Sequence, residues 1–195
     1  MGKVVVAHLG NGASMCAIRN GRSIASTMGF TALDGLAMGT RCGSIDPGVL
    51  LFLLQEEGLS PAQLSHVLYR ESGLIGLSGI ASDMRTLEAS DTPQARQAID
   101  YFVHRIRSEL GALAMTLGGL DALVFCGGIG ENSPAVRASV CRELDWLGIA
   151  LDEDANRESR THIGTGSTPV LVVRTDEEAV IAAAALEKLA AVRAR

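Results

Sequence analysis

The sequence lacks the charge excess and the long apolar run that would direct it to nucleic acid or into a membrane. It carries 22 acidic and 17 basic residues, so there is no basic surplus to attract nucleic acid or anionic lipid. No uninterrupted apolar run reaches the length that a bilayer-spanning helix needs. The first residues also lack the apolar segment and cleavage site of a signal peptide. We therefore expect a cytoplasmic protein that binds neither nucleic acid nor membrane.

Clustered metal ligands are missing too. Four cysteines and four histidines are scattered along the 195 residues, and no two cysteines have the spacing of a metal clip or a redox pair. Reduced thiols in the cytoplasm are the expected state of these cysteines. The same scatter argues against a zinc site.

Two common nucleotide-binding fingerprints are also absent. The sequence has no Gly-x-x-x-x-Gly-Lys-Ser/Thr motif, which excludes a P-loop. In the segment that begins at Gly128, Ser133 stands where the third glycine of a dinucleotide-binding fingerprint belongs. A Rossmann dehydrogenase is therefore disfavoured.

What the sequence does contain is a regular order of strands and helices. Apolar β-branched runs between turn signals predict strands at residues 3–8, 13–19, 23–27, 121–126 and 169–174. Polar caps followed by proline predict helices that begin at Pro47, Pro61, Pro93 and Pro134, and an alanine-rich helix comes last. Glycine-rich loops are expected at 31–46, 73–85 and 127–133. This order predicts an α/β fold in one domain, with a mixed sheet that opens with antiparallel hairpins and is flanked by helices.

The glycine-rich turns are candidates for a binding site. After the first strand, Gly10-Asn11-Gly12 can expose successive backbone N–H groups to an anion such as phosphate, although Asn-Gly also makes ordinary hairpin turns. The segment 127–132 lies between a strand and a helix that begins with proline, which is the context of a phosphate loop. By its residues alone, this segment is equally a packing contact between helix and sheet.

Arg41 is a candidate for catalysis. It stands in Gly39-Thr-Arg-Cys-Gly43, where a guanidinium can swing onto phosphoryl oxygens. The alternative is a surface arginine paired with Asp34 or Asp46. Composition does not choose between these two interpretations.

Glu177 is a candidate metal ligand at the start of the last helix. Thr175-x-x-Glu178 matches a capping box, so Glu178 is expected to serve the helix cap. Glu177 is not needed for that box and is available to hold Mg²⁺ directly or through water.

Five motifs follow one another along the chain: His8-Leu-Gly-Asn-Gly12, 35–47, 76–85, Gly127-Gly-Ile-Gly-Glu-Asn132 and Thr175-Asp-Glu-Glu178. Together they resemble the C-terminal half of the acetate kinase, or acetokinase, family, and the likeness covers essentially the whole chain. The resemblance implies an ATPase domain of the actin and hexokinase type. It also implies Mg²⁺-dependent, reversible phosphoryl transfer between ATP and acetate, giving acetyl phosphate and ADP, and a homodimer formed through this domain.

The resemblance assigns a role to each motif. Arg41 would stabilise the phosphoryl transition state, and Glu177 would serve the magnesium ion. Three groups would bind the nucleotide: the phosphate cradle His8, Leu9, Gly10, Asn11 and Gly12; the adenosine contacts Asp83, Met84 and Arg85; and the closing segment Gly128, Ile129, Gly130, Glu131 and Asn132.

The chain departs from the family in length, because the family's chains are about twice as long. The resemblance implies that the whole of residues 1–195 corresponds to the C-terminal nucleotide-binding domain, and that the family's N-terminal half, which would carry most of the acetate pocket, is absent from this sequence. We therefore expect the isolated chain to bind ATP or ADP and to have little or no activity unless the missing half is supplied in cis or in trans. A propionate or other short-chain acid kinase and a non-catalytic nucleotide-binding module remain the alternatives.

Overall fold

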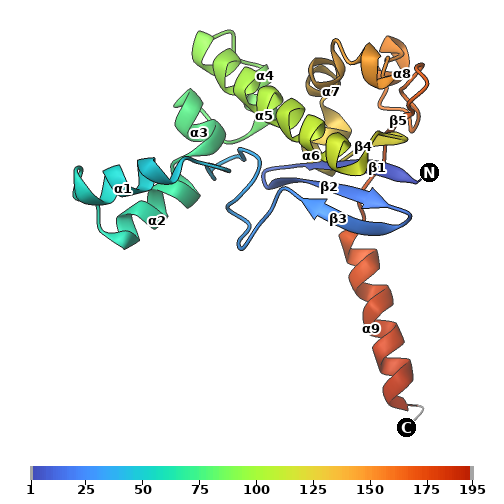
Figure 1. Cartoon of the computed structure of the whole chain (residues 1–195), viewed down its shortest axis with the longest axis horizontal. Coiled ribbons are helices and arrows are strands. Elements are labelled where there is room, and N and C mark those ends of the chain that lie inside the picture. Colours follow the sequence, from blue (N-terminus) through green and yellow to red (C-terminus); the bar gives the residue numbers. More distant parts are fainter. Residues whose placement is uncertain (1, 194–195) are drawn as a thin grey trace.

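One mixed sheet lies at the centre of this computed structural model, which describes residues 2–193 (Figure 1). β1 (Lys3–Leu9), β2 (Ala13–Arg19) and β3 (Arg22–Ser26) are antiparallel neighbours. β4 (Ala122–Cys126) pairs in parallel with β1, and β5 (Val170–Val172) pairs in parallel with β4. The order across the sheet is β3-β2-β1-β4-β5. The predicted mixed sheet with opening antiparallel hairpins is confirmed.

Helices fill the connections on either side of β4. Those between β3 and β4 are α1 (Pro47–Gln55), α2 (Pro61–Arg70), α3 (Gly73–Ser78), α4 (Met84–Glu88) and α5 (Pro93–Leu117). Those between β4 and β5 are α6 (Gly127–Asn132), α7 (Pro134–Cys141), the 3-10 helix η1 (Asp145–Leu147) and α8 (Glu153–Arg157). The last helix is α9 (Glu177–Arg193).

Local sequence signals account for most helix starts. Four predicted caps accept a backbone N–H of the first turn with their side chains: Asp46, Ser60, Thr92 and Ser133. The prediction for the last helix is wrong, because Asp176 accepts the N–H of Ala179 at 2.9 Å. Thr175, the predicted cap, instead donates its N–H and its hydroxyl to Glu131.

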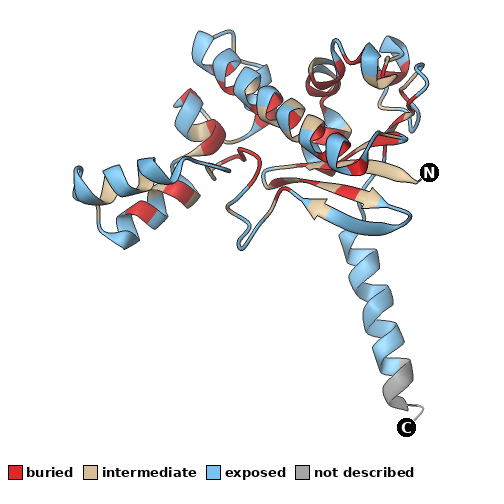
Figure 2. Cartoon of the chain, in the orientation of Figure 1, coloured by how far each residue is buried: buried red, intermediate tan, exposed pale blue. Residues whose placement is uncertain are grey.

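The core lies between the sheet and the 25-residue helix α5 (Figure 2). The apolar positions of α5 recur every three or four residues, so one face of the helix is buried against β1 and β2. Phe102, Ile106 and Leu110 on that face are 1% exposed or less. On β1, Val5 and Ala7 point into this core, while the alternate residues are only half-buried.

Two predicted glycine-rich loops contain short helices. The segment 73–85 includes α3 and the start of α4, both of which contact α5. The segment 127–133 includes α6, which contacts β1 and β4. Glycine disfavours helix and isolated helices this short are marginal, so tertiary packing rather than local sequence stabilises these turns. The helix that begins at Pro134 ends at Cys141, and α8 is a short helix that the sequence signals do not predict.

α9 extends away from the sheet (Figure 1). Its apolar residues face solvent, with Val180, Ile181 and Leu186 between 67% and 70% exposed. Among the described residues, no helix has both the length and the apolar character needed to cross a bilayer.

Candidate functional site

The sheet topology brings three chain segments to one edge. β1, β4 and β5 are parallel, so their carboxyl ends meet at the same side of the sheet. The turn 10–12 follows β1, α6 follows β4, and the segment that leads into α9 follows β5. Ligands of open α/β sheets bind outside the carboxyl ends of the strands.

A cleft of about 430 Å³ lies at this edge. Its lining comes from three of the sequence motifs and two further residues: Gly10, Asn11, Asp83, Met84, Arg85, Gly128, Ile129 and Asn132, with Glu88 and Ser133. Three segments that are at least 40 residues apart in sequence therefore line one cleft. This size is within the range of small-ligand sites.

Glu88 and Ser133 are the lining residues that sequence reasoning did not assign to the site. The hydroxyl of Ser133 donates to the carboxylate of Glu88, which joins α4 to the start of α7 across the cleft. Ser133 also accepts the N–H of Val136 at 3.1 Å. The only sequence signal at Ser133 is that of a helix cap, and Glu88 carries no motif at all.

The turn after β1 is tightly built. The N–H of Gly10 donates to the carbonyl of Gly12 at 3.0 Å, and the N–H of Gly39 donates to the carbonyl of Asn11 at 2.9 Å. A Cβ at Gly39 would lie 1.7 Å from Oδ1 of Asn11, so glycine is required for this close approach. The loop that carries Arg41 is thereby held against the turn.

Arg41 lies over this turn. A Cβ at Gly12 would be 2.9 Å from Nη2 of Arg41, and Nη1 donates to the carbonyl of Ala32 at 2.6 Å. Within residues 2–193, Arg41 makes no ion pair with Asp34 or Asp46, so the interpretation of Arg41 as a paired surface arginine is wrong. Its guanidinium is next to the backbone that is the candidate phosphate cradle.

His8 and Glu177 lie near each other outside the cleft lining. His8 Nε2 is 4.0 Å from Glu177 Oε1, and His8 Nδ1 is 3.6 Å from the thiol sulfur of Cys126. Burial raises the pKa of Cys126 to about 11, with a further contribution from the charges of Glu131 and Glu177. The thiol is therefore protonated at neutral pH and can donate to His8.

Five of the candidate nucleotide residues do not line the cleft: His8, described above, and Leu9, Gly12, Gly130 and Glu131. Leu9 is 0% exposed and belongs to the core. Gly12 lies under Arg41. Gly130 packs against Phe125, because a Cβ at Gly130 would be 3.5 Å from the backbone carbonyl carbon of Phe125. Glu131 accepts two hydrogen bonds from Thr175, just before α9, and one from Gly127 at the start of α6. Any contribution of Leu9, Gly12, Gly130 or Glu131 to binding is through the backbone or through support of neighbouring residues.

The adenosine candidates lie at the start of α4. Asp83 accepts the N–H and the hydroxyl of Thr86, and these hydrogen bonds lower the pKa of its carboxyl group. Nε of Arg85 lies 3.9 Å from Oδ1 of Asp83, and the side chain of Arg85 is 92% exposed. Met84 is 3% exposed, so it contributes an apolar floor rather than a mobile contact. Of these three residues, only Arg85 has a polar side chain that is free to move onto a ligand.

Glu177 fits the role of a magnesium ligand by its chemistry. Its side chain is 77% exposed and lies at the edge where the turn and α6 meet. Mg²⁺ is usually held by one or two carboxylates together with substrate phosphates and water. Among the described residues there is no cluster of three or more His, Cys, Asp or Glu side chains that could hold a metal ion alone. The donor set therefore suits a metal that arrives with a nucleotide.

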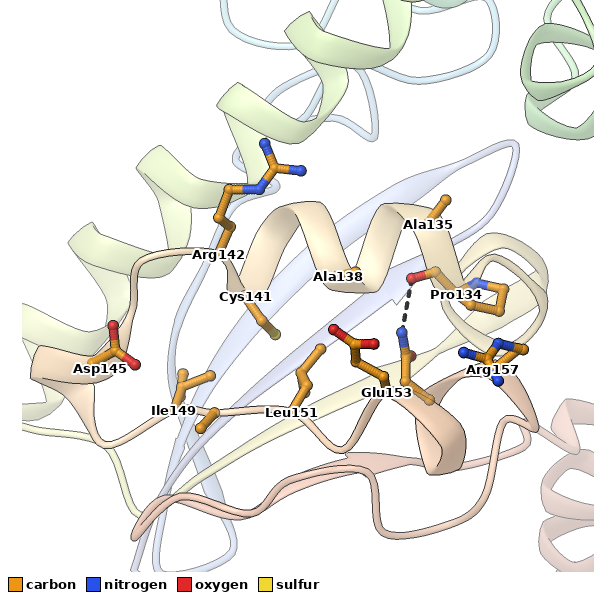
Figure 3. A pocket seen from close by; sticks show the side chains of 12 residues that line it. Pro134, Ala135, Ala138, Cys141, Arg142, Asp145, Ile149, Leu151, Glu153 and Arg157 are labelled. Atoms are coloured by element: carbon orange, nitrogen blue, oxygen red, sulfur yellow. Dashed lines mark hydrogen bonds between the residues drawn. The ribbon is translucent and has the colours of Figure 1, made fainter.

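A second cavity, of about 570 Å³, lies between α7 and α8 (Figure 3). It is larger than the cleft, but none of the candidate site residues lines it. Its walls carry Ala138, Cys141 and Leu151, with Glu153 and Arg157 at the rim. We assign the candidate site to the smaller cleft, because three of the motifs line it.

The chain is similar to known proteins over almost all of its length. The model of the acetokinase family matches residues 2–183. The chain is 62% identical over 183 residues to an acetate kinase of Methylocella silvestris, covering 93% of this chain and 45% of that protein. It is 49% identical over 185 residues to a propionate kinase of Salmonella typhimurium, covering 92% of this chain and 46% of that protein.

A solved structure is similar over nearly the whole chain. The crystal structure of Porphyromonas gingivalis acetate kinase matches with a TM-score of 0.92 and 40% identity, covering 96% of this chain and 49% of that one. This likeness confirms the predicted fold class. The chain spans about half the length of the relatives it matches.

Proposed function

The chain belongs to the acetokinase family, and we propose that it is the nucleotide-binding half of a kinase that transfers a phosphoryl group reversibly between ATP and acetate. The observation that carries this proposal is the single cleft shared by Gly10 and Asn11, the start of α4, and α6. These are segments that the family resemblance assigns to one nucleotide. The position of Arg41 over the turn adds a cation beside the candidate phosphate cradle.

The proposed reaction needs little covalent chemistry from the protein. A carboxylate oxygen of acetate attacks the terminal phosphorus of ATP, and the bond from that phosphorus to the bridging oxygen breaks, giving acetyl phosphate and ADP. Catalysis of such a transfer depends on positioning and on stabilisation of charge on the transferred group. The backbone N–H groups of Asn11 and Gly12 would orient the phosphates, since that of Gly10 is engaged by the carbonyl of Gly12. The Arg41 guanidinium would stabilise the phosphoryl oxygens in the transition state.

The metal requirement is part of this proposal. When bound, Mg²⁺ neutralises phosphate charge and fixes the geometry of the polyphosphate chain. Glu177 is the residue of this chain that would hold it. The Cys126 thiol would keep the His8 ring oriented with Nε2 toward Glu177, which limits the directions that the carboxylate can take.

Calorimetric titration of the 195-residue chain with Mg²⁺ and ADP tests the binding part. We expect measurable heat and a rise in Tm, with weaker affinity than a complete kinase has, because a closing second domain adds contacts. The assignment would be refuted if millimolar ADP produced no heat and no thermal shift. A coupled assay should detect negligible acetyl phosphate from the chain alone, and sustained turnover would contradict the proposed division of labour.

The substrate of the complete protein is part of the same proposal. Acetate is favoured by the most similar of the relatives described above, but the propionate kinase of Salmonella typhimurium is also a relative. Since the acid would be bound largely by the other half, this chain does not discriminate between them. Comparing kcat/KM for acetate and propionate, after the chain is combined with an acyl-binding half, decides the question. A complex that stays inactive with both acids would favour a non-catalytic nucleotide-binding module.

The exposed helix α9 supports the proposed domain organisation. We propose that residues 1–195 form the C-terminal domain of a two-domain kinase and that the other half covers the apolar residues of α9. Hydrogen exchange of residues 177–189 should slow when the acyl-binding half is added. Unchanged exchange in an active complex would contradict this placement.

A homodimer is the final part of the proposal. α1 is strongly apolar, yet none of its residues is buried: Leu51 is 54% exposed and Phe52 is 50% exposed. Such a face is typical of an interface, and a second copy is the proposed partner. In sedimentation experiments the unmodified chain should be a dimer and Phe52→Glu a monomer. The control Ile24→Glu, which changes a comparably exposed residue of β3, should remain a dimer. A monomeric unmodified chain at high concentration would contradict the dimer.

A further inference from the structure

Arg137 is the largest fully buried side chain among the described residues. It lies on α7 and is 0% exposed. Within residues 2–193 no carboxylate lies within 4.0 Å of its guanidinium. Burying a cation without a counter-ion is unfavourable unless hydrogen bonds satisfy it. The contacts of Arg137 therefore need an explanation in terms of what they hold.

Every N–H group of Arg137 has an acceptor. Nε donates to Oδ1 of Asn156 at 2.8 Å, and Nη2 donates to the carbonyl of Asn156 at 2.6 Å and to the hydroxyl of Ser159 at 2.9 Å. Nη1 donates to the carbonyls of Gly130 at 2.8 Å and Glu131 at 3.0 Å. One side chain thus connects the last turn of α6 to α8 and to Ser159, two residues beyond the end of α8.

The carbonyls of Gly130 and Glu131 lie in the last turn of α6, where the helix itself provides no N–H donors for them. The last carbonyls of a helix lack partners within it, and the negative end of the helix dipole lies there. A guanidinium at this position supplies both donors and positive charge. The planar fork of arginine reaches two acceptors on one side and two on the other, which an ammonium group cannot do.

α6 is fixed at a second point by the side chain of Glu131. Its Oε1 accepts the N–H of Gly127 at 3.0 Å and both the N–H and the hydroxyl of Thr175 at 2.9 Å. Burial acts to raise the pKa of Glu131, but these hydrogen bonds outweigh it and lower the pKa. The carboxylate therefore stays charged and connects α6 to the segment just before Glu177.

We propose that Arg137 is a positioning residue for the nucleotide cleft. It does not line the cleft. It holds the last turn of α6, so that Gly128, Ile129 and Asn132 on the same short helix keep their places in the cleft wall. Through Glu131 the same support extends to the start of α9. This inference rests on the proposed nucleotide site. It also predicts that Arg137 keeps α6 rigid when no nucleotide is bound.

The test is Arg137→Lys in the 195-residue chain, because lysine keeps the charge but has only three donors at a single nitrogen. The matched control is Arg157→Lys on α8, where the exposed arginine pairs, among the described residues, only with Asp154. Two quantities are measured: the Kd for ADP with Mg²⁺ by calorimetry, and the hydrogen exchange of amides 128–132 without nucleotide. Both are recorded well below the Tm of each variant, so that loss of global stability does not contribute.

We expect Arg137→Lys to raise the Kd by about fivefold or more, the lower end of typical coupling between sites, and to speed exchange in α6 selectively. The control should leave both quantities unchanged. A folded Arg137→Lys variant with an unchanged Kd and unchanged α6 exchange overturns the proposal, whatever its Tm. If the unmodified chain binds no ADP, the nucleotide assignment fails, and the exchange measurement still decides whether Arg137 orders α6.

A milder variant covers the case in which Arg137→Lys does not fold. Ser159→Gly removes one of the five hydrogen bonds, and glycine suits the positive φ of 50° at this position. We expect faster exchange in amides 128–132 and weaker ADP binding, both smaller than for a change at Arg137 itself. No change in either quantity would overturn the proposal.

Discussion

A leucine at Gly128 should block the nucleotide cleft without unfolding the protein. Gly128 is exposed, lines the cleft and is the second residue of α6. A Cβ built there meets no atom within 4 Å, so the side chain enters open space in the cleft rather than the core. Leucine is also about 1 kcal/mol better than glycine in a helix, so the fold should not be weakened.

The size of the effect follows from steric exclusion. Forcing extra atoms into an occupied space costs roughly 1–3 kcal/mol, which corresponds to a rise in the Kd for ADP of about 5-fold to 150-fold. Titration calorimetry measures this change, and circular dichroism with thermal unfolding shows that the variant is folded.

The matched control is Gly111→Leu. Gly111 is a helical glycine of α5, its Cβ position is equally open, and it lies outside the cleft. Gly111→Leu should leave the Kd unchanged. If Gly128→Leu binds ADP as tightly as the unmodified chain, or if both variants weaken binding equally, the cleft is not the nucleotide site.

Three further predictions concern the support of the site. Gly39→Ala places a Cβ 1.7 Å from Oδ1 of Asn11 and should lower Tm by roughly 2–10 °C, together with ADP affinity; an unchanged Tm would contradict the close approach. Arg41→Ala, in an active enzyme completed by the acyl-binding half, should reduce kcat far more than nucleotide affinity, and equal losses would indicate a binding role. The pKa of Glu131 is lower in the folded protein than its ordinary value of 4.5. The charged carboxylate should therefore stabilise the folded protein, relative to Glu131→Gln, fully above pH 4.5, and this stabilisation should disappear as the pH falls further. Urea unfolding of both proteins across that range measures it, and a difference that grows at low pH would contradict the sign.

Much of the fold could be predicted from short-range signals. The hairpin at Asn20-Gly21 has positive φ at both residues, as its sequence requires, and the caps before α1, α2, α5 and α7 form as expected. These features depend on neighbouring residues only. Where glycine-rich helices depend on distant packing, as in α3 and α6, the sequence predicted loops instead.

The residues of the candidate cleft could be chosen from the sequence only with the help of the family resemblance. Glycine turns predicted anion binding in general terms, but the meeting of Asn11, Arg85 and Gly128 depends on the sheet topology. Arg137 was missed because nothing in its local pattern separates a buried arginine from an exposed one on a short helix. Its role depends on acceptors in α6 and α8, and those contacts arise only in the folded chain.

Amide chemical shifts during a titration with Mg²⁺ and ADP test the central claim most directly. The account predicts that the largest changes occur at residues 10–12, 83–85 and 128–132, with smaller changes around Glu177. Changes confined to the larger cavity between α7 and α8, or no saturable change at any amide, would contradict it.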